Sequence, residues 1–320
     1  MMDITQNKIP LLVIGGPTAS GKTAVGVCAA KLLNGEIISA DSMQVYKDSP
    51  IATAKPTDEE TGGVPHHLMS VLDCNRQFSV AEYAHMAHNI IADINNRGRL
   101  PIMVGGTGLY IKAVVENLQF CEQDTAEYHR LREQYKAIEA ERLFDMLREC
   151  DPEQAEILGH QNKGRVIRAL AVYQMTGRTA EENLAWSRSV PTPYSTLYTI
   201  LSYNDRQTLY DRINRRVDIM AAQGLEEEAR MALVSPAGTF SQAIGHKELA
   251  PYFRGECSLE QTLDALKMQT RRYAKRQTTW FSAVPNAVRI ECDGKQAPAI
   301  AEEIAAMARS ENSPINNLLP

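Results

Sequence analysis

A glycine-rich segment near the start of the chain has the residue types and spacing of a phosphate-binding loop. It fits the pattern G-x-x-x-x-G-K-[ST] and lies between an apolar run at 11–14 and a helical pattern of apolar residues. In that setting backbone N–H groups and a helix N-terminus converge on one anion, Lys22 adds a positive charge, and the Thr23 hydroxyl can ligate Mg²⁺. The predicted phosphate- or diphosphate-binding residues are Gly16, Pro17, Thr18, Ala19, Ser20, Gly21, Lys22 and Thr23.

Asp41 is the second candidate for chemistry, because it follows a short predicted strand at 36–39. Nucleotide-cleaving enzymes with this loop usually place a Mg²⁺-binding Asp at the end of an apolar strand. The apolar run 102–104 leads instead into Gly105-Gly106-Thr107, which argues against a motor-type ATPase. Asp41 beside the loop can bind Mg²⁺ through water or act as a general base on a nucleophile. The structural alternative is that it caps the next turn.

The elements that must position these residues alternate between strand and helix. Ser79 and Glu82 form a capping box that predicts a helix to about Arg97, a strand follows at 100–104, and another helix begins after 108. Alternation of this kind is typical of parallel strands whose carboxyl ends bind ligands. The predicted fold class is α/β, a P-loop NTPase-like core with a central parallel sheet flanked by helices and an all-helical inserted domain.

The predicted inserted domain covers 119–190, where charged helical periodicity replaces the strand pattern. The core is then 1–118 together with 191–309, with a strand at 194–202, helices beginning near Asp205 and Ser258, and a last strand near 287–290. Residues 310–320 are expected to form a flexible tail.

Composition indicates an ordinary globular protein of 320 residues, 44% of them hydrophobic. No apolar stretch reaches the roughly 20 residues of a membrane span, and six scattered cysteines without a C-x-x-C pair suggest neither a zinc site nor a disulfide framework. We therefore expect a cytoplasmic protein with no membrane partner. The net charge of −5 argues weakly against non-specific nucleic-acid coating. However, residues 267–276 carry five basic and no acidic side chains, a run whose default interpretation is a solvated helix face.

Six motifs in order resemble those of the bacterial tRNA dimethylallyltransferase family. They are residues 16–23, 38–46, 53–56, 65–67, 105–110 and 273–280, so the resemblance covers about the whole chain.

The resemblance implies transfer of a dimethylallyl group from dimethylallyl diphosphate to N6 of the adenosine 3′-adjacent to the anticodon, tRNA position 37, with release of pyrophosphate. It assigns Asp41 as the base, Thr107 as the residue that orients this base, and Lys22 and Arg216 as clamps on the leaving group. The alternative for Arg216 is a salt bridge to a nearby acid. Mg²⁺ is the implied cofactor, held by Thr23 and, through water, by Asp41. The implied partners are dimethylallyl diphosphate and a tRNA anticodon stem-loop, bound by a monomer.

An RNA-facing set also follows from the resemblance. It comprises Asp41, Ser42, Met43, Gln44, Thr107, Gly164, Arg165, Arg168, Gln242, Gly245, His246, Lys247, Lys275, Arg276 and Gln277. Gly164, Gln242, His246 and Ser282 depart from the residues usual in the family. We expect these departures to affect tRNA affinity and preference, and not the chemistry.

Three alternatives remain open from the sequence. A transferase that prenylates free AMP, ADP or ATP would share the loop and the base, although the helical insertion and the basic segment favour tRNA. A small-molecule kinase would turn over ATP. An RNA-binding protein without activity would not require Lys22, Thr23, Asp41 and Thr107 together.

Overall fold

The computed structural model describes residues 8–121, 126–234 and 243–319. Backbone contacts divide the chain into two units, the larger formed by Met1–Val115 and Pro193–Pro320 and the smaller by Glu116–Thr192. None of the described helices combines the length and apolar character that a bilayer span requires.

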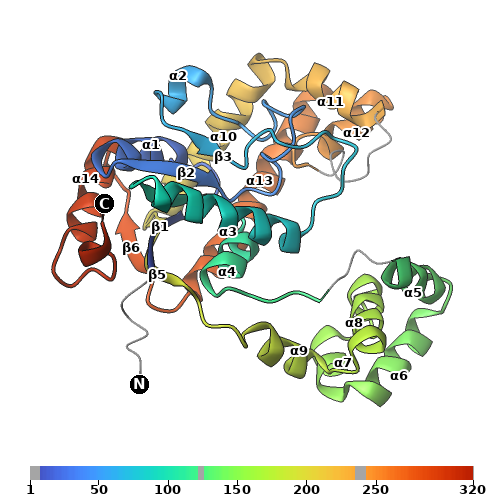
Figure 1. The fold of residues 1–320 in the computed structure, drawn as a ribbon. Coiled ribbons are helices and arrows are strands. Elements are labelled where there is room, and N and C mark those ends of the chain that lie inside the picture. Colours follow the sequence, from blue (N-terminus) through green and yellow to red (C-terminus); the bar gives the residue numbers. More distant parts are fainter. Residues whose placement is uncertain (1–7, 122–125, 235–242, 320) are drawn as a thin grey trace, which may run out of the picture. The chain divides into compact units, whose positions relative to one another are not determined.

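The larger unit is built on one parallel six-stranded sheet (Figure 1). Its strands are β1 (Ile9–Gly15), β2 (Gly35–Ser39), β3 (His66–His67), β4 (Leu100–Gly105), β5 (Tyr194–Ser202) and β6 (Val288–Glu291). Their order is β3-β2-β4-β1-β5-β6. The central strands are buried along nearly their whole length, which explains their continuous apolar runs. The predicted α/β fold class is confirmed, while the two-residue β3 was not predicted.

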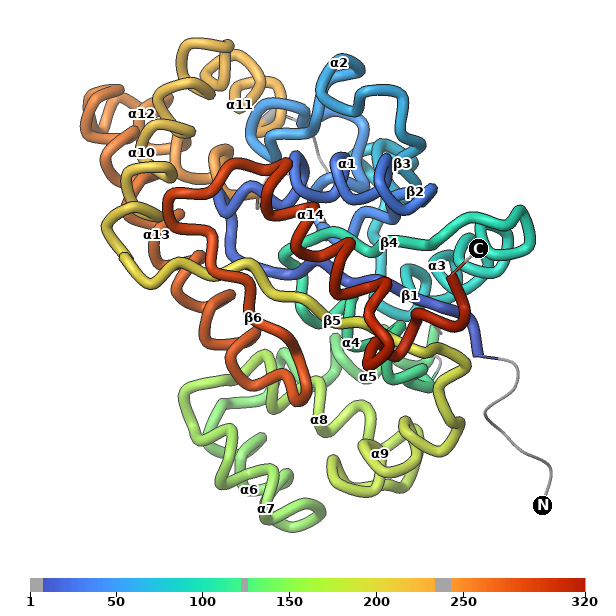
Figure 2. Tube along the Cα trace, turned by 90° about the vertical axis from the view of Figure 1, so that its left-hand side faces the viewer, coloured from blue at the N-terminus to red at the C-terminus, as the bar shows by residue number. Residues whose placement is uncertain are grey.

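Helices cover both faces of this sheet (Figures 1 and 2). The helices of the larger unit are α1 (Lys22–Leu32), α2 (Asp58–Thr61), α3 (Val80–Asn96), α4 (Gly108–Val115), α10 (Arg206–Ala222), α11 (Leu225–Val234), α12 (Ala250–Phe253), α13 (Leu259–Ser282) and α14 (Ala297–Ala308), with the 3₁₀ turns η2 (Lys247–Leu249) and η3 (Asn316–Leu318); within the described residues, α11 and α12 pack on α10, α13 and η2 and not on the sheet. Apolar residues of α1 and α14 form one core with the side chains on one face of the sheet. Helices α3 and α4 contact each other and β4 on the opposite face.

Three of these helices begin where the sequence predicted, each with a capping side chain. Ser79 with Glu82 opens α3, Ser258 with Gln261 opens α13, and the Asp205 carboxylate accepts the amides of residues 207 and 208 at the start of α10. Capping of this kind satisfies N–H groups that have no partner inside the helix. These local signals therefore locate α10 and α13, the two helices that later prove to contact the phosphate loop.

Among its described residues the smaller unit contains helices and connecting loops and no strand. It contains α5 (Ala126–Lys136), α6 (Ala140–Cys150), α7 (Pro152–Leu158), α8 (Lys163–Thr176) and α9 (Ala180–Ser187). Its core is formed by α6 and α8 and includes Leu143, Leu147 and Leu170. The buried Asp151 caps α7 through the Gln154 amide (3.1 Å) and accepts the Ala180 amide (2.7 Å), and so ties α7 to α9.

The segment after Ser310 packs on the larger unit, contrary to the expected flexible tail. Ile315 is fully buried in the core that joins α1, α14 and the sheet, and the Ser195 hydroxyl donates to the Pro314 carbonyl at 2.5 Å. The prolines and asparagines that suggested fraying surround a single apolar anchor. Burial of that anchor offsets the entropy lost on ordering the segment.

We predict that Ile315→Ala lowers the free energy of unfolding by about 2–4 kcal/mol, because it removes a buried side chain and leaves a cavity. The check is urea denaturation followed by circular dichroism. Ile219→Ala, at an apolar residue of α10 that is 48% exposed, is the matched control and should change stability by less than about 0.5 kcal/mol. Equal effects of the two substitutions would contradict the packing of this segment.

Candidate active site

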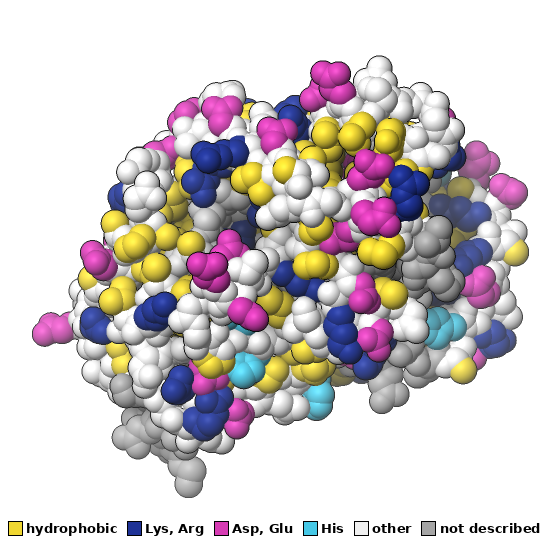
Figure 3. Space-filling view, turned by 90° about the horizontal axis from the view of Figure 1, so that it is seen from above, with side chains coloured by type: hydrophobic (Ala, Val, Ile, Leu, Met, Phe, Trp, Pro, Cys, Tyr) yellow, Lys and Arg dark blue, Asp and Glu magenta, His cyan; other side chains and the backbone are white. Residues whose placement is uncertain are grey.

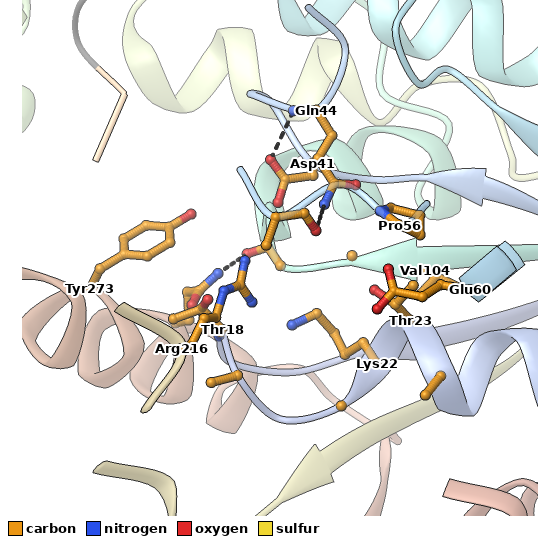
Figure 4. A pocket seen from close by; sticks show the side chains of 17 residues that line it. Thr18, Lys22, Thr23, Asp41, Gln44, Pro56, Glu60, Val104, Arg216 and Tyr273 are labelled. Carbon is orange, nitrogen blue, oxygen red and sulfur yellow. Dashed lines mark hydrogen bonds between the residues drawn. The ribbon is translucent and has the colours of Figure 1, made fainter. Parts of the chain in front are cut away.

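The predicted phosphate loop, Asp41 and Thr107 follow β1, β2 and β4 at one edge of the sheet. A cavity of about 500 Å³ opens there, and its lining includes Lys22, Thr23, Asp41, Gln44 and Arg216. Figure 4 shows Lys22, Arg216 and Asp41 converging on the same space. The parallel topology accounts for this meeting, because the carboxyl ends of neighbouring strands share one edge.

The phosphate loop is shaped by backbone conformation and by contacts from two distant helices. Gly21, at the N-cap of α1, has φ 91°, a value that glycine adopts without strain. From α13, Gln277 accepts the Thr18 amide at 2.8 Å and donates to the Gly106 carbonyl at 2.9 Å. From α10, the Arg212 guanidinium donates to the Ala19 carbonyl at 2.8 Å. The loop is thus held open at the N-terminus of α1.

Lys22 lies within the loop that it serves, and its Nζ donates to the Pro17 carbonyl at 2.6 Å. Burial of the ammonium, together with the nearby Arg216 cation, lowers the pKa of Lys22 to about 7, while Asp41 opposes this shift. A bound anion would favour the charged form. The position is therefore suited to an ammonium that pairs with a phosphate.

Arg216 extends from α10 into the same cavity, where its Nη2 donates to the Thr53 carbonyl at 3.3 Å. Burial lowers the pKa of this guanidinium and Asp41 raises it. Within the described residues it forms no salt bridge, so the structural alternative raised for it does not apply. Its remaining N–H groups are available to a ligand.

Asp41 caps its own turn and also faces the cavity. Its Oδ1 accepts the Met43 amide at 2.9 Å and the Gln44 amide at 3.3 Å, so this oxygen caps the following turn. Oδ2 takes no hydrogen bond from any described residue, and the carboxylate lines the cavity. The cap fixes the carboxylate and leaves one oxygen able to accept a proton.

Thr107 forms a hydrogen bond with Ser42, the residue after Asp41, and not with Asp41 itself. Its Oγ1 accepts the Ser42 amide at 3.0 Å, and its own amide donates to the Ala40 carbonyl at 3.0 Å. These two bonds join the end of β4 to the turn that carries Asp41. The resemblance assigned the Thr107 hydroxyl to orienting the base, and in the described residues this hydroxyl bonds to the backbone of the turn that carries Asp41, with no bond to the carboxylate itself.

A second, more apolar cavity of about 220 Å³ adjoins the first and shares Thr18, Asp41, Arg216 and Tyr273 with it. Its other walls include Met43, Val217, Met220, Ile244 and Leu266. This cavity was not predicted from the sequence, because apolar residues of α10 and α13 have the same spacing whether they face a core or a ligand.

The predicted RNA-facing residues fall into different environments. Lys247, Lys275 and Arg276 are exposed on the larger unit, and Gly164, Arg165 and Arg168 are exposed on the smaller one. Arg165 and Arg168 line a cavity of about 550 Å³ that also contains Arg178 and Trp186. Gln242 lies outside the described residues. On the face seen in Figure 3, basic side chains are interspersed with acidic ones and form no continuous basic surface.

Three residues assigned to the RNA surface, Gln277, His246 and Gly245, are buried instead. The Gln277 side chain hydrogen-bonds to both the phosphate loop and Gly106. It lies so close that a Cβ added to Gly106 would be 2.3 Å from the Gln277 Nε2. His246 is fully buried beside Glu228, and the adjacent Gly245 is buried as well. The Gln277 and His246 side chains form hydrogen bonds with buried partners. The basic residues near them in the sequence gave no indication of this role.

Comparison with known proteins identifies the family of this chain. Residues 44–284 match the model of the IPP transferase family. The tRNA dimethylallyltransferase of Caldanaerobacter subterraneus is 44% identical over 281 residues, which are 86% of this chain and 89% of the relative. That of Macrococcus caseolyticus is 42% identical over 310 residues, which are 96% of this chain and 98% of the relative.

Solved structures give the same result. The tRNA isopentenylpyrophosphate transferase of Bacillus halodurans superposes with a TM-score of 0.70 at 41% identity, over 93% of this chain and 95% of that one. A eukaryotic dimethylallyltransferase acting on tRNA superposes with a TM-score of 0.82 at 28% identity, over 93% of this chain and 78% of that one. With a family model that spans most of its length and relatives that match nearly all of it, this chain belongs to the IPP transferase family.

Proposed function

We propose that this chain transfers the dimethylallyl group of dimethylallyl diphosphate to N6 of the adenosine 3′-adjacent to the anticodon, tRNA position 37, and releases pyrophosphate. One observation carries the proposal: two cations and a phosphate loop face the same cavity as a carboxylate with one oxygen to which no described residue donates a hydrogen bond. The adjoining apolar cavity offers walls to an allyl group. A kinase is less well supported, because β4 ends at Gly105 and is followed by Gly106, where a metal-binding carboxylate would be expected.

In the proposed reaction the diphosphate lies in the phosphate loop, with Lys22 and Arg216 on its oxygens. As the allylic C–O bond breaks, negative charge grows on the leaving group, and these preorganised donors stabilise it. The adenine N6 forms the new bond to the allylic carbon. Its proton passes to Oδ2 of Asp41, because Oδ1 is held by the Met43 and Gln44 amides.

The donor set fits a magnesium ion bound mainly through the substrate. The described residues contain no cluster of three His, Cys, Asp or Glu side chains that could hold a metal by itself. Mg²⁺ commonly binds through one or two protein oxygens, phosphate oxygens and water. We propose that the Thr23 hydroxyl, and Asp41 through water, supply those protein oxygens. When bound, Mg²⁺ would neutralise charge on the diphosphate.

We predict that the protein prenylates an anticodon stem-loop and that Asp41→Asn lowers kcat by about 10³-fold, since the amide cannot accept the proton. Affinity for the stem-loop should change less than about threefold, because a base acts in the transition state more than in binding. Mass spectrometry of the nucleosides measures the product, and free AMP serves as the competing acceptor. Product on AMP alone would refute the tRNA assignment, and normal turnover by Asp41→Asn would refute the base.

A second prediction follows from the lowered pKa of Lys22, about 7 against an ordinary value of 10.5. Between these values the unfolded chain binds more protons than the folded protein, so the cost of burying charged Lys22 is complete below pH 7 and fades as the pH rises. Lys22→Met should therefore stabilise the ligand-free protein by about 1–2 kcal/mol at pH 6 and by less at pH 9.5. Urea denaturation at both pH values checks this. Lys31→Met, at an exposed lysine of the same helix, should show no such pH dependence, and a pH-independent effect of Lys22→Met would contradict the prediction.

A third prediction concerns the exposed basic segment of α13. If Lys275 and Arg276 contact phosphates, their double substitution by alanine should weaken stem-loop binding and reduce the slope of log K against log[salt] by about 1.5. The measurement is a fluorescence titration at several salt concentrations. Lys295→Ala, which removes an exposed lysine paired with Glu303, is the control. An unchanged slope in the double variant would make this segment an ordinary solvated helix face.

A further inference from the structure

Glu228 on α11 is a buried acid to which neither the motifs nor the proposed reaction assign a role. Its side chain is 5% exposed. Its Oε2 accepts the Ile51 amide at 2.7 Å, and its Oε1 accepts the Ala52 amide at 2.9 Å and the Ser49 hydroxyl at 3.2 Å. The Nε2 of His246 lies 3.0 Å from the same Oε1. Several donors from two separate segments thus converge on one carboxylate.

The segment that Glu228 holds, residues 49–55, has no helix or strand of its own and borders the active site. The Thr53 carbonyl accepts the Arg216 guanidinium at 3.3 Å and the Gln44 amide group at 3.1 Å. The Thr53 hydroxyl also bonds to the Ser49 carbonyl, and Ala54 lines the main cavity. The position of this segment therefore sets the positions of two side chains that line the cavity, those of Arg216 and Gln44.

We propose that Glu228 is a positioning residue for the diphosphate end of the site. Through the Ile51 and Ala52 amides it fixes residues 49–55, and through the Thr53 carbonyl it sets the Arg216 guanidinium against the leaving group. This inference rests on the proposed function, in which Arg216 binds the diphosphate.

The surroundings of Glu228 argue that the carboxylate does more than fill space. Val217, Leu225, Ala229, Leu249 and Leu266 form an apolar cluster around this region, with Ile51 and Ala52 packed against it. An apolar side chain would fit such a cluster at a lower desolvation cost than a carboxylate. A charged acceptor, however, can hold two consecutive amides of an irregular segment, which an apolar group cannot.

The ionised form is maintained at this position. Burial raises the pKa of Glu228, but the hydrogen bond from His246 and those from the Ala52 and Ile51 amides outweigh it, so the pKa is lowered. The acceptor is therefore charged at neutral pH.

The test compares Glu228→Gln, Glu228→Asp and Ser49→Ala with the unaltered protein in steady-state prenylation of an anticodon stem-loop. Glutamine replaces one acceptor oxygen by a donor that faces a backbone amide. We expect it to raise KM for dimethylallyl diphosphate and Kd for inorganic pyrophosphate about tenfold and to lower kcat. KM for the stem-loop should change less than twofold. Glu228→Asp, which keeps the charge, should recover part of the loss, and Ser49→Ala, which removes one donor, should lose least.

Glu227→Gln is the matched control, because this neighbour on α11 is 71% exposed and its one ion pair within the described part of the chain, to Arg230, is long at 3.7 Å. Thermal melting of each variant distinguishes a variant that does not fold from a folded one in which residues 49–55 and Arg216 are displaced. If Glu228→Gln folds and its KM for dimethylallyl diphosphate and its affinity for pyrophosphate are unchanged, the proposal is overturned. If Glu228→Gln does not fold, unchanged values in both Ser49→Ala and Glu228→Asp would overturn it. Equal losses for both substrates would also overturn it. Absence of prenylation by the unaltered protein would instead refute the proposed function.

Discussion

The active site depends on the positive charges of Lys22 and Arg216, which lie close together. Among the described residues, Asp41 offsets only part of this charge. Lys22 and Arg216 approach one cavity closely enough that Arg216 helps to lower the pKa of Lys22. Such an arrangement costs free energy in the empty protein, because buried cations lose hydration. In the proposed function, the cost is recovered when a diphosphate occupies the site. A site that already holds this charge needs no further reorganisation as negative charge grows on a leaving group.

Holding this site open requires support from segments that are far apart in the chain. Gln277 of α13 and Arg212 of α10 hold the phosphate loop from outside it, and Glu228 of α11 holds the segment that meets Arg216. None of these three residues belongs to the phosphate-loop motif. Each satisfies a backbone group that an irregular loop leaves without a partner. The loop alone thus provides the donors, and the helices packed around it provide their geometry.

The same geometry explains how a phosphate loop can serve chemistry at carbon. A nucleotide hydrolase needs a carboxylate that holds a metal on the phosphate to be cleaved. Here the carboxylate of Asp41 is fixed by its own turn, with one oxygen facing the cavity. In the proposed reaction this oxygen accepts a proton from the attacking amine while the diphosphate departs unbroken. The loop then acts as a clamp for a leaving group.

The sequence by itself determined the features that depend on local physics. The apolar runs of β1, β2 and β4, the capping boxes at Ser79 and Ser258, and the phosphate-loop pattern each arise from a few neighbouring residues. Only the tertiary structure decided the roles of Gln277, His246, Glu228 and Ile315. Gln277 and His246 stand in segments that suggested an RNA surface, yet each is buried against a partner far away in the sequence. A polar side chain has the same local pattern whether it faces solvent or a buried amide. What decides between the two is which backbone groups the fold leaves unsatisfied, and that is settled only when distant segments meet.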